Sequence, residues 1–196
     1  VDRPRVKGKF LYKGNQKLWI RGVTYGTFRP NAEGDLFPNP ITVEQDFFRI
    51  ASHGFNAIRT YTLPPRWLLD VASRCGLFVL VGLWWDQFVT FLDDKKLVHS
   101  IKQRVRESIH RCAGHPAVLA YSLANEIPAQ IVRWYGRRKI ELFLEQLHSI
   151  AKSEDPHGLV TYVNYPTTEY LDLPFLDFIC FKVYLEKPDT LKAYLA

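Results

Sequence analysis

The run Ala117-Val118-Leu119-Ala120-Tyr121-Ser122-Leu123-Ala124-Asn125-Glu126-Ile127-Pro128 is almost entirely apolar until it ends in an amide, a carboxylate and a proline. Its length and composition predict a buried strand that ends at Asn125 and Glu126. In parallel α/β folds, the residues that carry out chemistry lie at the carboxyl ends of the strands. Asn125 and Glu126 are therefore the first candidates for a functional site.

Working outward from this strand, apolar runs alternate with helical patterns along the chain. Residues 77–83 are continuously apolar, which is typical of a parallel strand covered on both faces. Residues 10–20 predict a β-hairpin whose second arm continues into a first core strand. The alternation predicts an α/β protein with a parallel sheet and right-handed crossovers. The predicted core strands are 21–25, 57–61, 77–83, 117–125, 159–164 and 178–184.

Open doubly wound sheets and closed (β/α)8 barrels both fit this pattern. Gly22 and Gly26 do not form the G-x-G-x-x-G turn that binds dinucleotides, which lowers the nucleotide-binding alternative. A closed barrel of this type has eight strands, whereas the pattern predicts about six. On this evidence the two architectures both stay open.

Composition bounds the class of protein. With 196 residues, 47% of them hydrophobic, the chain is predicted to fold as one domain over residues 1–196. The net charge of +6 is spread over predicted helices among acidic residues, which indicates solvated helix faces rather than a nucleic-acid partner. We find no apolar run long enough for a membrane segment and no export signal, and the compartment stays open.

Metal and cofactor chemistry finds little support in the sequence. The three cysteines lie far apart and lack a C-x-x-C pairing, and the six histidines show no ligand spacing. We therefore predict no metal site, no disulfide framework and no cofactor.

The predicted strand ends bring a distinctive set of side chains to one rim. Aromatic rings stack on sugar faces, while amides and arginine bind hydroxyl groups, so the set predicts a site for an oligosaccharide or polysaccharide. The alternative is that the aromatic residues belong to the core and the carboxylates are solvated loop residues. The candidate residues are Tyr25, Arg59, Trp84, Trp85, Asn125, Glu126, Asn164 and Tyr184.

Four runs, in order along the chain, resemble the barrel of the clan A retaining glycoside hydrolases. They are similar above all to family two, which includes β-galactosidases and β-glucuronidases. The resemblance implies a (β/α)8 TIM-barrel fold, incomplete here, with about six β/α units and strands seven and eight absent from this chain. The matching runs are Leu18 to Val23, Gly54 to Thr60, Ala72 to Val79, and His115 through Glu126.

By this resemblance, Glu126 is the general acid/base of a retaining β-glycoside hydrolase or transglycosylase. Asn125 would hold the sugar 2-hydroxyl, Arg59 would lie beneath the nucleophile, and Tyr184 would match the site tyrosine of the sixth strand. The family's nucleophile is a glutamate on the seventh strand, so the chain by itself is expected to be inactive or nearly so. Residues 159–171 also resemble barrel domains that precede a glycosyltransferase in large bacterial polysaccharide-processing proteins.

Two features favour alternatives to catalysis. Lys182 is an unusual charge in an apolar strand, and it either points into the barrel mouth or pairs with a carboxylate such as Glu126. A non-catalytic glycan-binding domain, or a truncated barrel fragment, would also fit the six strands. An open six-stranded arc would leave two exposed edges, which predicts a homo-oligomer formed through them.

Overall fold

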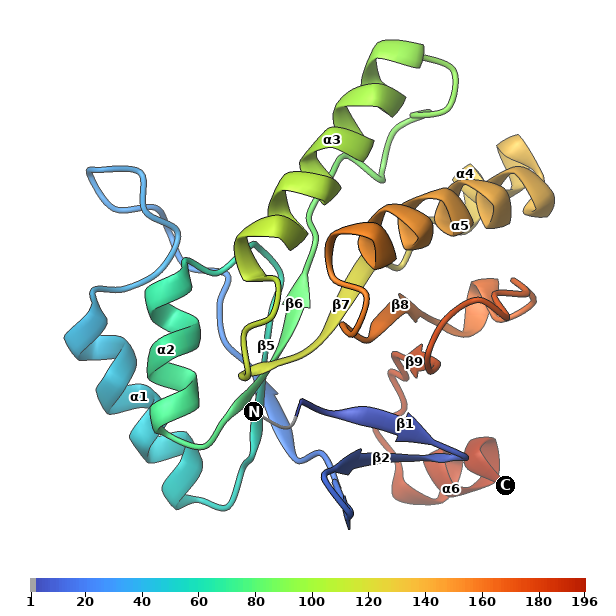
Figure 1. The fold of residues 1–196 in the computed structure, drawn as a ribbon. Coiled ribbons are helices and arrows are strands. Elements are labelled where there is room, and N and C mark those ends of the chain that lie inside the picture. Colours follow the sequence, from blue (N-terminus) through green and yellow to red (C-terminus); the bar gives the residue numbers. More distant parts are fainter. Residues whose placement is uncertain (1–2) are drawn as a thin grey trace.

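The computed structural model describes residues 3–196 and shows a parallel six-stranded sheet curled into half of a barrel (Figure 1). The strands lie side by side in chain order, each parallel to the next. Their carboxyl ends therefore share one edge of the sheet, as predicted. The strands are β4 (Gly22–Thr24), β5 (Ala57–Thr60), β6 (Phe78–Gly82), β7 (Val118–Asn125), β8 (Val160–Asn164) and β9 (Cys180–Phe181).

The helices connect these strands and cover the outer face of the sheet (Figure 1). The side chain of Asn39 caps the first helix by accepting a hydrogen bond from the Thr42 backbone N–H at 3.0 Å. Asp94 caps the third helix in the same way, with the Lys96 N–H at 2.8 Å. The helices are α1 (Pro40–Ser52), α2 (Arg66–Arg74), α3 (Lys95–Cys112), α4 (Ala129–Tyr135), α5 (Arg137–Glu154), the 3-10 helix η1 (Pro166–Thr168) and α6 (Pro188–Leu195).

The two faces of the sheet have different partners because successive strand residues point to opposite sides. Ile58, Val79 and Tyr162 belong to the main core, which they form with the inner sides of the helices. Ala57 and Phe78 lie on the other face, in a smaller apolar cluster. The inner face of the half-barrel is thus apolar near the amino ends of its strands.

A three-stranded antiparallel sheet covers this inner cluster. It consists of β1 (Arg5–Lys7), β2 (Phe10–Lys13) and β3 (Gln16–Lys17). Val6 and Leu11 pack against the inner cluster. The hairpin is confirmed, but its second arm does not continue directly into the first core strand, because residues 18–21 are outside any strand. By closing the amino end, this sheet leaves the carboxyl edge as the open end of the half-barrel.

The last strand is shorter than predicted. Residues 178–184 were expected to form a strand, but β9 contains only Cys180 and Phe181. It lies at one edge of the sheet and pairs only with β8, so it gains hydrogen bonds from one side. β4 is the opposite edge, and association of two copies through these edges stays a prediction. Among the described helices, none combines the length and apolar character needed to cross a membrane.

Gly82 allows β5 and β6 to approach closely beneath the open end. A Cβ atom at this position would lie 2.4 Å from the backbone oxygen of Thr60 and 2.7 Å from that of Tyr61. Because both neighbours are backbone atoms, the strands would have to separate. We expect Gly82→Ala to lower the free energy of unfolding by roughly 1–3 kcal/mol, measured by urea denaturation.

Gly8→Ala is the matched control for this substitution. Gly8 has a φ of +61°, but a Cβ there would meet nothing within 4 Å. Its substitution therefore reports only the backbone cost of a left-handed residue, which is about 1 kcal/mol. If Gly82→Ala were no more destabilising than Gly8→Ala, the close approach of the strands would not be the cause.

Candidate active site

Glu126 lies immediately after β7 and has an unusual backbone conformation. Its φ is +51°, in the left-handed region that non-glycine residues seldom occupy. Hydrogen bonds from two successive backbone N–H groups to β8 hold Glu126 and Ile127 in place. The Glu126 N–H donates to the Val163 oxygen at 2.8 Å, and the Ile127 N–H donates to the Tyr162 hydroxyl at 3.0 Å. Such conformations persist where the surroundings fix them, and they concentrate at functional sites.

The Glu126 carboxylate contacts two side chains that follow β9. The Tyr184 hydroxyl donates to Oε1 at 2.8 Å, and the Lys182 ammonium lies 3.3 Å from the same oxygen. Lys182 also lies over the rings of Tyr61 and Tyr184, at 5.6 and 5.3 Å from their centroids. Burial lowers the pKa of Lys182, but hydrogen bonds to Tyr184 and Tyr61 and the charge of Glu126 outweigh it, so that this pKa is raised.

Asn125 and Arg59 form the second part of the site. An Arg59 guanidinium nitrogen donates to the Asn125 side-chain oxygen at 2.5 Å, and the guanidinium stacks on the Tyr61 ring at 4.5 Å from its centroid. Gln87 fixes the Asn125 backbone: its oxygen accepts from the Asn125 N–H at 3.0 Å, and its amide donates to the Asn125 carbonyl. Side chains from β5, β7 and the loop after β6 therefore converge at one point.

A hollow of about 330 Å³ lies at the carboxyl edge, and its lining includes Arg59, Gln87 and Asn125. The volume is within the range of small-molecule sites, about 300–1,000 Å³. Trp84 and Phe88 stand at its mouth with 54% and 60% of their surface exposed, so their ring faces are free to stack on a ligand. The hollow is thus lined by amide and guanidinium groups next to exposed aromatic rings, and Glu126 follows Asn125 directly in the chain.

The sequence matches the model of one known protein family. The model described as glycosyl hydrolases family 2, TIM barrel domain, matches residues 5–196. The chain belongs to this family. It is 30% identical to human β-glucuronidase over 188 residues, which cover 91% of this chain and 27% of that protein. It is 27% identical to the β-galactosidase of Leuconostoc mesenteroides over 135 residues, which cover 64% of this chain and 12% of that protein.

Solved structures show the same barrel. The β-glucuronidase from Ruminococcus gnavus in complex with D-glucuronic acid superimposes with a TM-score of 0.75 at 20% identity, over 94% of this chain and 31% of that one. Bacteroides uniformis β-glucuronidase 2, covalently bound to cyclophellitol-6-carboxylate aziridine, gives a TM-score of 0.77 at 17% identity, over 93% of this chain and 23% of that one. The chain thus spans less than a third of the length of these proteins.

Three residues predicted to bind substrate lie instead on the helix side of this family 2 barrel. Trp85 is 1% exposed, donates from its indole N–H to the Leu123 oxygen at 2.7 Å and packs against rings of the outer layer. Tyr25 is buried and donates to Asp46 at 2.8 Å. Asn164 is buried and bonds to Thr168. The structure therefore places Trp85, Tyr25 and Asn164 away from the hollow, and a role for them in substrate binding stays a prediction.

The alternation of side chains along a strand explains the positions of Tyr25 and Asn164. Tyr25 is two residues after Val23, and Asn164 is two residues after Tyr162. Val23 and Tyr162 both face the helix-side core. Strand position alone placed these side chains at the rim, whereas their parity turns them outward.

Two site residues were not among the predicted substrate-binding residues. Gln87 comes from the loop after β6, where no sequence pattern marks it. Lys182 is an unusual charge in a predicted apolar strand, and the structure shows the pairing with Glu126, one of the two arrangements that the sequence predicts. A charged residue in an otherwise apolar predicted strand is thus a sequence signal that points to this site.

Metal and thiol chemistry have no assembled site in residues 3–196. No group of three or more His, Cys, Asp or Glu side chains in that range is placed to hold a metal ion. The three cysteines are free, and burial raises the pKa of the Cys112 thiol to about 11. A thiol with so high a pKa is a poor nucleophile at neutral pH.

Proposed function

We propose that this chain is the catalytic barrel of a retaining β-glycosidase that acts on a β-linked saccharide, with residues 1–196 acting as one domain. The observation that carries the proposal is Glu126, a carboxylate at the end of β7 beside the bonded pair Asn125 and Arg59. Membership of glycosyl hydrolases family 2 and similarity to β-glucuronidase and β-galactosidase support it.

Glu126 is proposed as the general acid/base. In the first step its protonated form would give a proton to the glycosidic oxygen, and in the second its carboxylate would take a proton from water. Tyr184 and Lys182 contact Oε1 as a donor and a cation, which suits the carboxylate form that the second step requires. Asn125 is placed beside it to bind a sugar hydroxyl.

The mechanism needs a second carboxylate about 5 Å from the first to attack the anomeric carbon. Within residues 3–196, the hydrogen bonds and ion pairs of Glu126 and Arg59 include no other carboxylate, and the buried Arg59 Nε has no partner. A buried guanidinium nitrogen without a partner is costly. We infer that a carboxylate from outside these residues pairs with Arg59, and that the six strands are the first six of an eight-stranded barrel.

The test is hydrolysis of p-nitrophenyl β-D-glucuronide and β-D-galactoside by the protein that carries this barrel. We expect cleavage in which the first sugar product, observed by proton NMR, is the β-anomer. Release of the α-anomer first would exclude a retaining mechanism.

The ion pair of Lys182 and Glu126 favours a second candidate function, a glycan-binding domain without catalysis. In this ion pair, the carboxylate proposed as the acid/base is already bound to a cation. Calorimetric titration with β-linked oligosaccharides separates the two candidates. Binding of intact oligosaccharide, with no cleavage over hours, would favour the binding domain.

A further inference from the structure

Three hollows that share lining residues extend from the candidate active site toward the loop after β4. The site hollow shares Thr62 and Trp84 with a second hollow, of about 270 Å³. That second hollow shares Leu36, Leu63 and Arg111 with a third, of about 640 Å³, which we call the outer groove. Three hollows in a row suit a chain of sugar units better than a single sugar.

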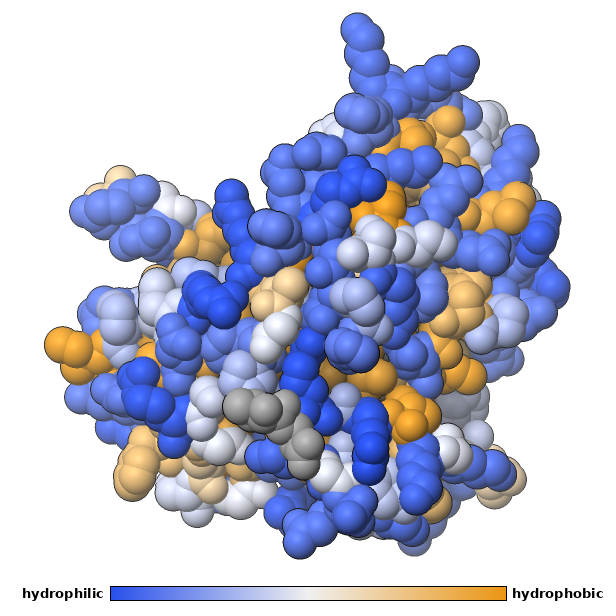
Figure 2. Space-filling model, in the orientation of Figure 1, coloured by the Kyte–Doolittle hydropathy of each residue, from blue (hydrophilic) through white to orange (hydrophobic). Residues whose placement is uncertain are grey.

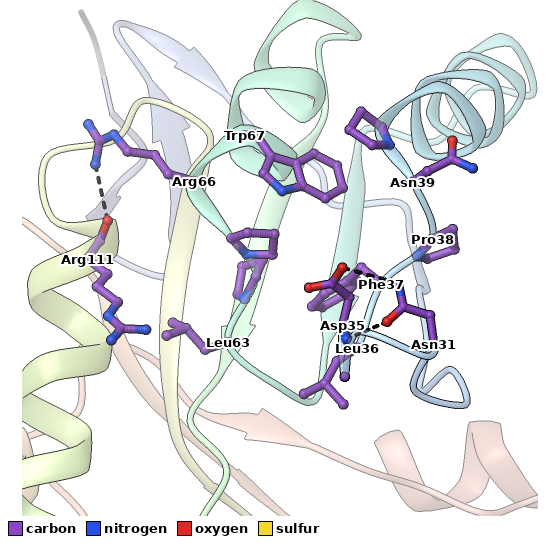
Figure 3. A pocket seen from close by; sticks show the side chains of 14 residues that line it. Asn31, Asp35, Leu36, Phe37, Pro38, Asn39, Leu63, Arg66, Trp67 and Arg111 are labelled. Atoms are coloured by element: carbon purple, nitrogen blue, oxygen red, sulfur yellow. Dashed lines mark hydrogen bonds between the residues drawn. The ribbon is translucent and has the colours of Figure 1, made fainter.

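The outer groove lies between the loop of residues 26–39, after β4, and the start of α2. Figure 3 shows Trp67 near its centre, Arg66, Arg111 and Leu63 on one side, and the segment from Asn31 to Asn39 on the other. In Figure 2 the tip of the same loop stands out from the surface at the upper left. An indole, four prolines and two asparagine side chains line this one hollow, so that it offers contacts for both the apolar face and the hydroxyls of a sugar.

The loop wall is held in shape by Asn31. Its side-chain oxygen accepts hydrogen bonds from the Glu33 and Asp35 backbone N–H groups, at 3.0 and 2.7 Å. Its amide donates to the Asp35 carboxylate at 3.1 Å. This wall is therefore largely formed before a ligand binds, which lowers the entropy cost of binding.

Positive charge gathers on the opposite wall. Arg66 donates to the Arg111 backbone oxygen at 3.2 Å, and Figure 3 shows the two guanidinium groups at separate places along this wall. Within residues 3–196, neither guanidinium has a carboxylate within ion-pair distance. In the middle hollow, by contrast, Arg104 lies 3.9 Å from Asp86, and Glu107 accepts from Gln103 at 3.0 Å. Among the described residues, the outer groove is thus lined by two guanidinium groups without a carboxylate partner, one of them shared with the middle hollow, and by a single carboxylate, Asp35.

We propose that the outer groove binds an acidic sugar unit of a β-linked oligosaccharide whose far end reaches Glu126. Arg66 and Arg111 bind its carboxylate or sulfate group, since guanidinium groups match the geometry of both anions, and Trp67 contacts its ring. The proposal rests on the proposed function, because it takes the candidate active site as the place where the saccharide is processed. It adds a substrate class, an acidic polysaccharide rather than a neutral one.

The test measures binding by calorimetry in the Glu126→Gln background, where turnover is suppressed. The ligands are tetramers of β-linked mannuronate, cellotetraose and sulfated cellotetraose. We expect at least one acidic tetramer to bind more tightly than cellotetraose, and Arg66→Gln with Arg111→Gln to weaken that acidic ligand about tenfold or more. Cellotetraose should lose less than threefold. Comparison of the two acidic tetramers tells whether carboxylate or sulfate is preferred.

Arg106→Gln is the matched control, because it removes one positive charge from the helix that carries Arg111. Arg106 itself pairs with Glu154, away from the groove. It should leave all three affinities unchanged, and Arg111→Gln alone should show part of the loss. Equal affinity for acidic and neutral tetramers, or an unchanged acidic affinity in the double variant, would overturn the proposal. Because these affinities are measured without hydrolysis, the groove and the acid/base role of Glu126 can fail independently.

Discussion

Replacing Glu126 with glutamine is expected to lower kcat/KM for p-nitrophenyl β-glycosides by roughly 10²–10⁴-fold in the protein that carries this barrel. That is the range that general acid–base catalysis usually contributes. The amide keeps the shape of the side chain. It can still accept the hydrogen bond that the Tyr184 hydroxyl donates to Glu126 in the wild type, at 2.8 Å. It cannot give a proton to the leaving oxygen. The measurement is steady-state kinetics at the pH of maximal activity.

The dependence on the leaving group distinguishes an acid from a structural residue. A dinitrophenolate leaves without protonation, so Glu126→Gln should slow cleavage of its glycoside much less than that of a methylphenyl glycoside. Glu186→Gln serves as the control, because Glu186 is an exposed carboxylate that follows β9 by a few residues, and it should leave both rates unchanged. A uniform loss across leaving groups, or full activity in Glu126→Gln, would remove Glu126 as the acid.

The part of the site that could be predicted from sequence depends on strand order alone. An apolar run that stops at Asn125 and Glu126 places both at a strand end. Arg59 lies near the end of the predicted strand 57–61, which is two strands away in chain order. In a parallel sheet these ends must meet, and the structure brings Arg59 and Asn125 into a hydrogen bond. No knowledge of loops was needed for that result.

The part that could not be predicted depends on loop conformation and on long-range pairing. Gln87 bonds the Asn125 backbone from a loop whose course nothing in its sequence indicates. The φ of Glu126, +51°, is likewise set by partners on β8 rather than by its own residue type. The outward turn of Trp85 could have been predicted from its parity with Leu83, which is buried in the helix-side core.

Asp155 joins the amino-terminal segment to the middle of the chain in a buried network that no sequence pattern marks. Arg3 donates to both of its carboxylate oxygens, at 2.7 and 2.8 Å. The Tyr121 hydroxyl of β7 donates to it at 2.8 Å, and the Gly114 N–H at 3.3 Å. Asp155 is 4% exposed. The network ties β7 and the end of α5 to the segment that leads into the amino-terminal sheet.

We expect Asp155→Asn to lower the free energy of unfolding at pH 7 by about 3–5 kcal/mol, the usual cost of removing one partner from a buried ion pair. The Arg3 guanidinium would be left 14% exposed without its counter-charge. Urea denaturation provides the measurement. Glu44→Gln, which breaks the exposed pair with Arg74, is the control and should change stability little.

The pH dependence of this difference tests its electrostatic origin. Burial raises the pKa of Asp155, but hydrogen bonds from Arg3 and Tyr121 and the charge of Arg3 outweigh it, so that this pKa lies below its ordinary value of 3.8. The folded state then binds fewer protons here than the unfolded state, so the stabilisation is complete above about pH 4 and disappears as the pH falls through the folded pKa. The stability gap between the wild type and Asp155→Asn should therefore narrow below pH 4. A gap that stays constant down to pH 2.5 would mean that packing, and not the Arg3 ion pair, is what Asp155 contributes.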